Sequence, residues 1–122
     1  MKALIVDDSR TTRAILRAIL EEAGFSVSET GLPRAGLEAV AGQDPPDLVL
    51  LDWHLPEMTG LDFLRELKAK ALPRPPRVML VTSEAEVQAV QRALDLGASE
   101  YVMKPFTREI LVEKLQMVGI HA

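Results

Sequence analysis

The chain alternates between short, continuously apolar runs and longer stretches in which apolar residues recur at helical spacing. Short apolar runs bounded by turn signals are typical of strands that are covered on both faces of a parallel sheet. The segment at residues 25–28 instead alternates apolar and polar residues, as a half-exposed strand does. The pattern therefore predicts five strands, at residues 3–6, 25–28, 48–51, 78–81 and 101–103.

A helix is predicted after each of these strands. The first helix spans residues 9–23 and is followed by Gly24, a common stop signal. Its apolar stripe is expected on the buried face and its arginines on the opposite, solvated face, with Ala14, Ile15, Ala18 and Ile19 set against Arg10, Arg13 and Arg17.

The remaining helices have apolar stripes of the same kind. Pro33 suits the first turn of the second helix, and Thr107 is expected to cap the last one. The stripes consist of Leu37 and Val40, then Leu61, Leu64 and Leu67, then Val87, Val90, Ala93 and Leu94, and finally Ile110, Leu111, Leu115 and Val118. Strands that each precede a helix predict an α/β fold with a mostly parallel five-stranded sheet.

Composition bounds what this fold can do. A chain of 122 residues fits one domain, and the absence of cysteine excludes disulfides, thiolate metal sites and cysteine catalysis. The net charge of -4 argues against nucleic acid or an anionic membrane as the main partner. No apolar run is long enough for a membrane span, and the N-terminus does not resemble a signal peptide. We expect one soluble, cytoplasmic domain that covers residues 1–122.

Polar residues gather where the predicted strands end. Each has an ordinary structural explanation when taken alone, such as a helix N-terminus for adjacent acids or a surface position for a lysine. The carboxyl ends of parallel strands, however, meet at one edge of the sheet, where ligands of open α/β sheets bind. The residues concerned are Asp7 and Asp8 after the first strand, Asp52 after the third, Thr82 and Ser83 after the fourth, and Lys104 after the fifth.

Three carboxylates at one edge would repel each other unless a cation or a raised pKa relieves them. Ligation by oxygen atoms alone suits Mg²⁺ or Mn²⁺, and such an ion also binds phosphate oxygens. A carboxylate can attack phosphorus and form an aspartyl phosphate, while Lys104 pairs with the anion and Thr82 donates a hydrogen bond to it. The set therefore favours phosphoryl transfer to one aspartate.

The residues that carry this chemistry resemble the receiver domain of two-component response regulators, most closely the single-domain, CheY-like chemotaxis regulators. The resemblance covers the whole chain and rests on the motifs at residues 6–9, 52–60, 81–85 and 101–107. It implies a doubly wound, flavodoxin-like (βα)5 fold with strand order 2-1-3-4-5, an order that is itself a standard example of the rule used above to locate the ligand edge.

The resemblance also implies roles for individual residues. Asp52 would be the phosphoacceptor, and Mg²⁺ would be bound by Asp8 and Asp52 directly, by Asp7 through water, and by the backbone carbonyl of His54. Lys104 would contact a phosphoryl oxygen, with a cis bond to Pro105. Thr82 and Tyr101 would be the switch residues, and His54 and Glu84, which flank the site, would tune the lifetime of the phosphoryl group.

A protein of this kind is a signalling switch that catalyses only its own phosphorylation and dephosphorylation. A histidine kinase or a small phosphodonor would supply the phosphoryl group. The surface formed by the fourth helix, the fifth strand and the fifth helix would then bind a target protein, such as a flagellar motor component or another signalling protein.

Two alternatives stay open at this point. An Asp-nucleophile phosphatase would use the same acid, but such enzymes carry a second aspartate where this chain has His54. A scaffold that keeps the fold without phosphorylation would not respond to Mg²⁺. Among the other residues near the site, we expect the His54 imidazole to be exposed to solvent, and Trp53, Met79 and Met103 to pack in the core.

Overall fold

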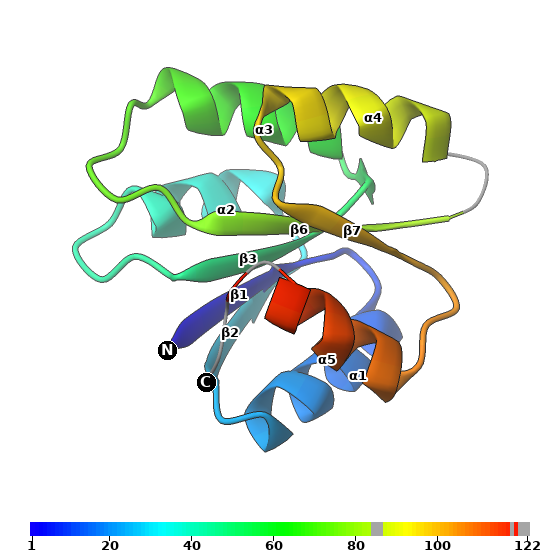
Figure 1. Cartoon of the computed structure of the whole chain (residues 1–122). Coiled ribbons are helices and arrows are strands. Elements are labelled where there is room, and N and C mark those ends of the chain that lie inside the picture. The colour runs from blue at the N-terminus through cyan, green and yellow to red at the C-terminus, as the bar shows by residue number, and fades with distance from the viewer. Residues whose placement is uncertain (84–86, 118, 120–122) are drawn as a thin grey trace.

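The computed structural model describes residues 1–83, 87–117 and 119. A five-stranded parallel sheet lies at its centre in the spatial order β2-β1-β3-β6-β7 (Figure 1). This confirms the predicted α/β class and the order 2-1-3-4-5, since the third, fourth and fifth strands of the sheet are β3, β6 and β7. The strands are β1 (Lys2–Val6), β2 (Ser26–Thr30), β3 (Leu48–Asp52), β6 (Arg77–Thr82) and β7 (Glu100–Met103).

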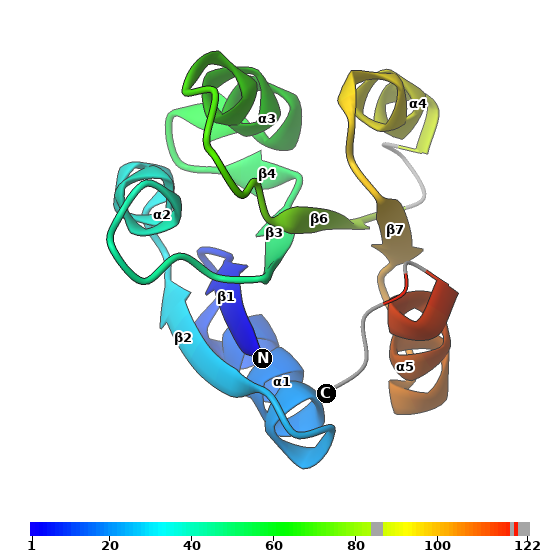
Figure 2. The ribbon, with the colours of Figure 1, turned by 60° about the vertical axis from the view of Figure 1, so that its left-hand side comes forward.

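Helices cover both faces of the sheet. Figures 1 and 2 show α1 (Arg10–Glu22) and α5 (Arg108–Met117) on one face. The other face is covered by α2 (Pro33–Val40), α3 (Gly60–Ala69) and α4 (Val87–Leu96). None of the helices in the described part of the chain is both long and apolar enough to cross a membrane. Predicted stripe residue Val118 and flanking residue Glu84 lie outside the described residues.

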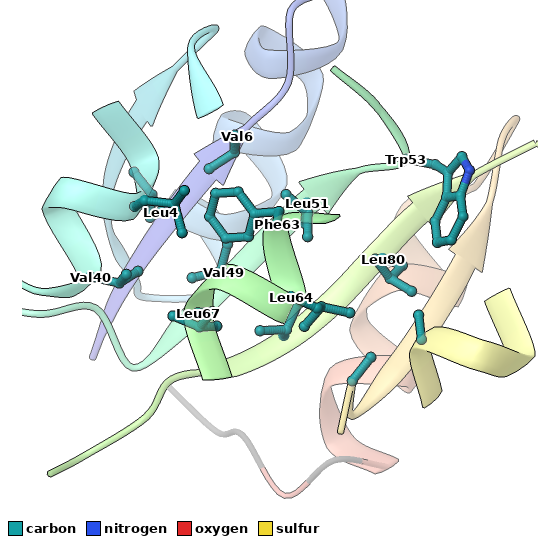
Figure 3. Close-up of a cluster of buried hydrophobic side chains, with 14 of the residues drawn as sticks. Leu4, Val6, Val40, Val49, Leu51, Trp53, Phe63, Leu64, Leu67 and Leu80 are labelled. Atoms are coloured by element: carbon teal, nitrogen blue, oxygen red, sulfur yellow. The ribbon is translucent and has the colours of Figure 1, made fainter. Parts of the chain in front are cut away.

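Each face of the sheet has its own hydrophobic core, and β3 contributes to both because all five of its residues are buried. Figure 3 shows the core beneath α2, α3 and α4, with the Phe63 ring close to Val6 and Leu51. Gly36 lets α2 approach this ring, since a Cβ there would lie 2.9 Å from Val6 Cγ2 and 3.3 Å from Phe63 Cε2. The sheet is thus held rigidly between two packed layers.

The buried face of α1 differs from the prediction. Leu16, Ile19 and Leu20 are buried, whereas Ile15 is 49% exposed. Both stripes satisfy helical spacing, and the one with the larger side chains at two adjacent turns buries more apolar surface against the sheet. Of the three arginines expected on the solvated face, Arg10 is exposed, whereas Arg13 and Arg17 turn toward the edge strand β2 and bind Glu29.

Two further side chains predicted to be buried lie at the surface. Ile110 is 46% exposed and Met103 is 42% exposed, while Trp53 and Met79 are buried as expected. Met103 stands at the end of β7, an edge strand that is covered less completely than β3. Position at the sheet edge, rather than residue type, decides its exposure.

The sequence pattern also missed a small hairpin after β3. It consists of β4 (His54–Leu55) and β5 (Met58–Thr59), which pair antiparallel, and its turn places Glu57 at a φ of 70°. Two-residue strands are too short to leave a periodic signal. The hairpin leads directly into α3, where Thr59 and Asp62 form a capping box, and so fixes the chain that follows Asp52.

Substitutions at two adjacent positions test the face of α1. Leu16→Ala should lower the free energy of unfolding by about 2–5 kcal/mol, because it opens a cavity in the core. Ile15→Ala, the matched control, should change it by no more than about 0.5 kcal/mol, because the side chain is half exposed. Urea denaturation of both variants measures this, and a larger loss for Ile15→Ala would contradict the structure.

Candidate functional site

Three carboxylates converge at the carboxyl edge of the sheet. The strands β1 and β3 are neighbours, with Val6 opposite Leu51, so the residues that follow them lie side by side. Asp7, Asp8 and Asp52 each place a carboxylate oxygen within 4.8 Å of the others. Asp7 and Asp52 are buried, with 1% and 7% exposure, whereas Asp8 is exposed.

Local hydrogen bonds fix the orientation of Asp7. Its amide donates to the Thr30 carbonyl (3.1 Å), and its Oδ1 accepts from the amide of Ser9 (2.8 Å). The Ser9 hydroxyl in turn caps α1 by accepting from the amide of Thr12 (3.2 Å). Asp7 Oδ2, by contrast, is buried and accepts no hydrogen bond among the described residues.

Thr82 at the end of β6 and Lys104 directly after β7 complete the site. Lys104 Nζ lies 3.2 Å from Asp52 Oδ1 and 3.7 Å from Asp7 Oδ2. The Lys104 amide donates to the Thr82 carbonyl (2.7 Å), and the following bond to Pro105 is cis. The Thr82 side chain is buried, and its hydroxyl donates to the Ser83 carbonyl at 3.3 Å.

The pKa of Asp52 is raised to about 6, chiefly by burial and next by the charge of Asp7, while Lys104 opposes the shift. One ammonium group does not balance three carboxylates in this pocket. Buried charges need such compensation, because their solvation by water is lost.

The donor set fits a divalent cation. A buried oxygen of Asp7 accepts no hydrogen bond among the described residues, and oxygen atoms from three carboxylates are the ligands that Mg²⁺ prefers. A bound Mg²⁺ would supply the positive charge that Lys104 alone does not provide.

The other residues singled out from the sequence lie around this cluster. The His54 side chain is exposed, as expected, and its backbone pairs with Thr59 in the β4–β5 hairpin. Tyr101 is half buried against the core of the α4 face, and Lys114 Nζ lies 4.9 Å from the centroid of its ring.

A cavity of about 490 Å³ lies at the opposite end of the sheet, between Lys2, Pro46 and Arg77. Lys2 there is already paired with Asp44, and its amide donates to Asp47. None of the residues that the strand-end argument selects lines this cavity, so the acidic cluster remains the candidate site.

Comparison with known proteins decides the family. The protein-family model of the response regulator receiver domain matches residues 3–116, a range that contains every residue of the site. The chain belongs to this family. Receiver domains are components of two-component signalling, typically act as switches rather than as enzymes, and generally bind Mg²⁺, for which the acidic cluster is suited.

Curated relatives of this receiver domain carry chemotaxis names. It is 34% identical to the chemotaxis protein CheY of Pseudomonas aeruginosa over 118 residues. This match covers 97% of this chain and 95% of the relative. It is 33% identical over 119 residues to chemotaxis protein CheY1 of Helicobacter pylori, with 97% and 96% covered. The receiver domain is therefore CheY-like over nearly its whole length.

Solved structures agree with this assignment. The chemotaxis response regulator CheY4 of Vibrio cholerae superposes with a TM-score of 0.83 at 29% identity, over 96% of this chain and 97% of the other. A receiver domain protein from Clostridium thermocellum reaches a TM-score of 0.85 at 29% identity, over 96% and 92%. The fold is thus the receiver fold, with the acidic cluster at its ligand edge.

One residue at the site escaped the sequence analysis. Arg13 of this receiver domain donates from Nη1 to the backbone carbonyl of Asp7 (2.6 Å). The only signal in the sequence is its spacing, one helical turn after the cap Ser9, which returns its side chain to the preceding loop.

The raised pKa of Asp52 predicts a pH dependence of stability. The folded chain takes up a proton near pH 6, whereas the ordinary pKa of 3.8 applies when it is unfolded. The folded state binds more protons at Asp52 between these values, so without metal the contribution of Asp52 to the free energy of unfolding is greatest at low pH and falls as pH rises through about 6.

Asp52→Asn removes this charge and should stabilise the metal-free protein at about pH 8 by up to about 3 kcal/mol, with the gain vanishing toward about pH 4. Urea denaturation in EDTA measures the difference. Substitution of an exposed acid, Asp95→Asn, should not reproduce it. Equal stability of Asp52→Asn and the wild type at about pH 8 would show that Asp52 is not held unfavourably charged.

Proposed function

We propose that this receiver domain is a phosphorylation-activated switch, with Asp52 as the phosphoacceptor. The observation that carries the proposal is the buried Asp52 carboxylate, which lies beside two further carboxylates and 3.2 Å from the ammonium group of Lys104. A carboxylate in this position is held ready beside a cation that can pair with the incoming phosphoryl oxygens.

The phosphoryl donor is a histidine kinase or a small phosphate compound. One oxygen of Asp52 attacks the phosphorus, and the bond from phosphorus to the donor's nitrogen or oxygen breaks. The leaving group keeps the electron pair: an imidazole nitrogen takes a proton from water, whereas a carboxylate such as acetate leaves as the anion. Lys104 pairs with the phosphoryl oxygens as their charge moves onto the domain.

Asp8 and Asp52 would hold Mg²⁺ directly and Asp7 would hold it through water, with the His54 carbonyl completing the protein ligands. When bound, the ion neutralises the charge that develops on the transferred phosphoryl group. The buried position of Asp7 supports this role, because one of its carboxylate oxygens lies within 4.8 Å of those of Asp8 and Asp52, and its Oδ2 accepts no hydrogen bond among the described residues.

The new charge on Asp52 would act on Thr82, whose buried hydroxyl donates to the Ser83 carbonyl at 3.3 Å. A phosphoryl oxygen is a stronger acceptor, so it would draw the hydroxyl inward and let Tyr101 move after it. This shifts the surface formed by α4, β7 and α5 toward a state that binds a target protein.

Labelling tests the phosphoacceptor. With Mg²⁺ and acetyl phosphate, the wild type should gain one phosphoryl group per chain by intact-protein mass spectrometry, and Asp52→Asn should gain none, because it lacks the attacking oxygen. Asp47→Asn, an exposed aspartate at the other end of the sheet, should label like the wild type. Full labelling of Asp52→Asn would refute the assignment.

The same samples separate this function from its rivals. Catalytic turnover of added phosphate esters would favour a phosphatase. A scaffold that is never phosphorylated predicts that Mg²⁺ leaves the fluorescence of Trp53 unchanged, although Trp53 directly follows Asp52. If the domain is a switch, Mg²⁺ should change the fluorescence of Trp53. Target proteins should then be captured only when beryllofluoride occupies the site.

A further inference from the structure

The loop between β1 and α1 carries two of the three carboxylates, and the backbone of the sheet holds it only at its start, where the Asp7 amide donates to the Thr30 carbonyl of β2 (3.1 Å). Strand pairing of β1 ends at Val6 on both sides. The Asp7 carbonyl lies beyond the last rung of the ladder and accepts instead from Arg13 Nη1 at 2.6 Å. A charge-assisted bond of this length fixes the Asp7–Asp8 peptide more firmly than a water molecule would.

Arg13 is itself held from a second side. Its Nε donates to Glu29 Oε1 (3.1 Å), and Glu29 Oε2 accepts from Arg17 Nε (2.7 Å). Hydrogen bonds from Arg17 and Arg13 keep the pKa of Glu29 below its usual range, so this carboxylate stays ionised. The Arg13 side chain is only 16% exposed, which leaves its guanidinium little freedom to leave the loop.

Gly31 provides the space that Arg13 occupies. A Cβ at this position would lie 3.0 Å from Arg13 Nη1 and 3.6 Å from the Asp7 carbonyl oxygen. A side chain on Gly31 would therefore push the guanidinium away from Asp7. Residues from β2, α1 and the loop after β2 thus converge on one backbone carbonyl next to the acidic cluster.

We infer that Arg13 is a positioning residue that sets the affinity of the Asp7, Asp8 and Asp52 cluster for Mg²⁺ by fixing the Asp7–Asp8 peptide. The inference rests on the proposed metal site. Residues that hydrogen-bond to metal-binding residues and orient them change the affinity for the metal in this way, although they do not touch the ion.

The sign of the effect separates positioning from charge. Arg13 is a cation near a cation site, so its charge alone opposes Mg²⁺ binding, and its removal would strengthen binding if charge were its only effect. If Arg13 positions the carboxylates, its removal weakens binding. A residue that serves only the stability of the fold would leave the affinity of the folded protein unchanged.

The experiment is a Mg²⁺ titration of Arg13→Met, followed by calorimetry and by Trp53 fluorescence. We expect affinity about tenfold below that of the wild type, the scale on which such outer partners act. Arg17→Met is the matched control, because Arg17 shares Glu29 with Arg13 but makes its described hydrogen bonds to Glu29 and Glu21. Its affinity should stay at the wild-type value or rise.

Gly31→Ala provides a test that keeps Arg13 in place, should Arg13→Met unfold. It should weaken Mg²⁺ binding in the wild-type background, and should add nothing to Arg13→Met, because the side chain that it displaces is then gone. Unchanged or tighter Mg²⁺ binding by folded Arg13→Met, or by Gly31→Ala, would overturn this inference and leave the proposed metal site standing. Failure of the wild type to bind Mg²⁺ would overturn the metal site and this inference together.

Discussion

Repulsion among three carboxylates is the constraint on which the rest of this structure depends. Asp7 and Asp52 are brought together because β1 and β3 are neighbours in the sheet, and burial makes each charge costly. A single lysine offsets part of that charge, and burial still raises the pKa of Asp52. The fold tolerates this local instability because two packed cores hold the strands from both faces.

The same constraint links chemistry to conformational change. A pocket with excess negative charge attracts a divalent cation, and a phosphoryl group on Asp52 would then replace one charge arrangement with another. Thr82 and Lys104 stand at the ends of adjacent strands β6 and β7, and a backbone hydrogen bond joins them. In the proposed switch, a charge change at the cluster would reach the surface of β7 through these two strand ends.

Much of the fold and site could be predicted from the chain alone. Continuous apolar runs such as residues 48–51 require burial on both faces, which only the middle of a sheet provides. Asp7, Asp8, Asp52, Thr82 and Lys104 follow such runs directly, so their meeting at one edge follows from parallel topology. The hairpin at residues 54–59 could not be predicted, because two-residue strands leave no period in the sequence.

The sequence by itself determined the alternation of strands and helices, the edge that carries the chemistry, and the types of residue available there. Tertiary structure alone decided which of two equally spaced stripes α1 buries, and therefore that Leu16 rather than Ile15 packs on the sheet. It also decided that Arg13 bonds to Asp7 instead of facing solvent. The physical reason is shared: helical periodicity fixes which residues lie together, but only the neighbouring strand β2 and Gly31 fix which side of the helix meets them.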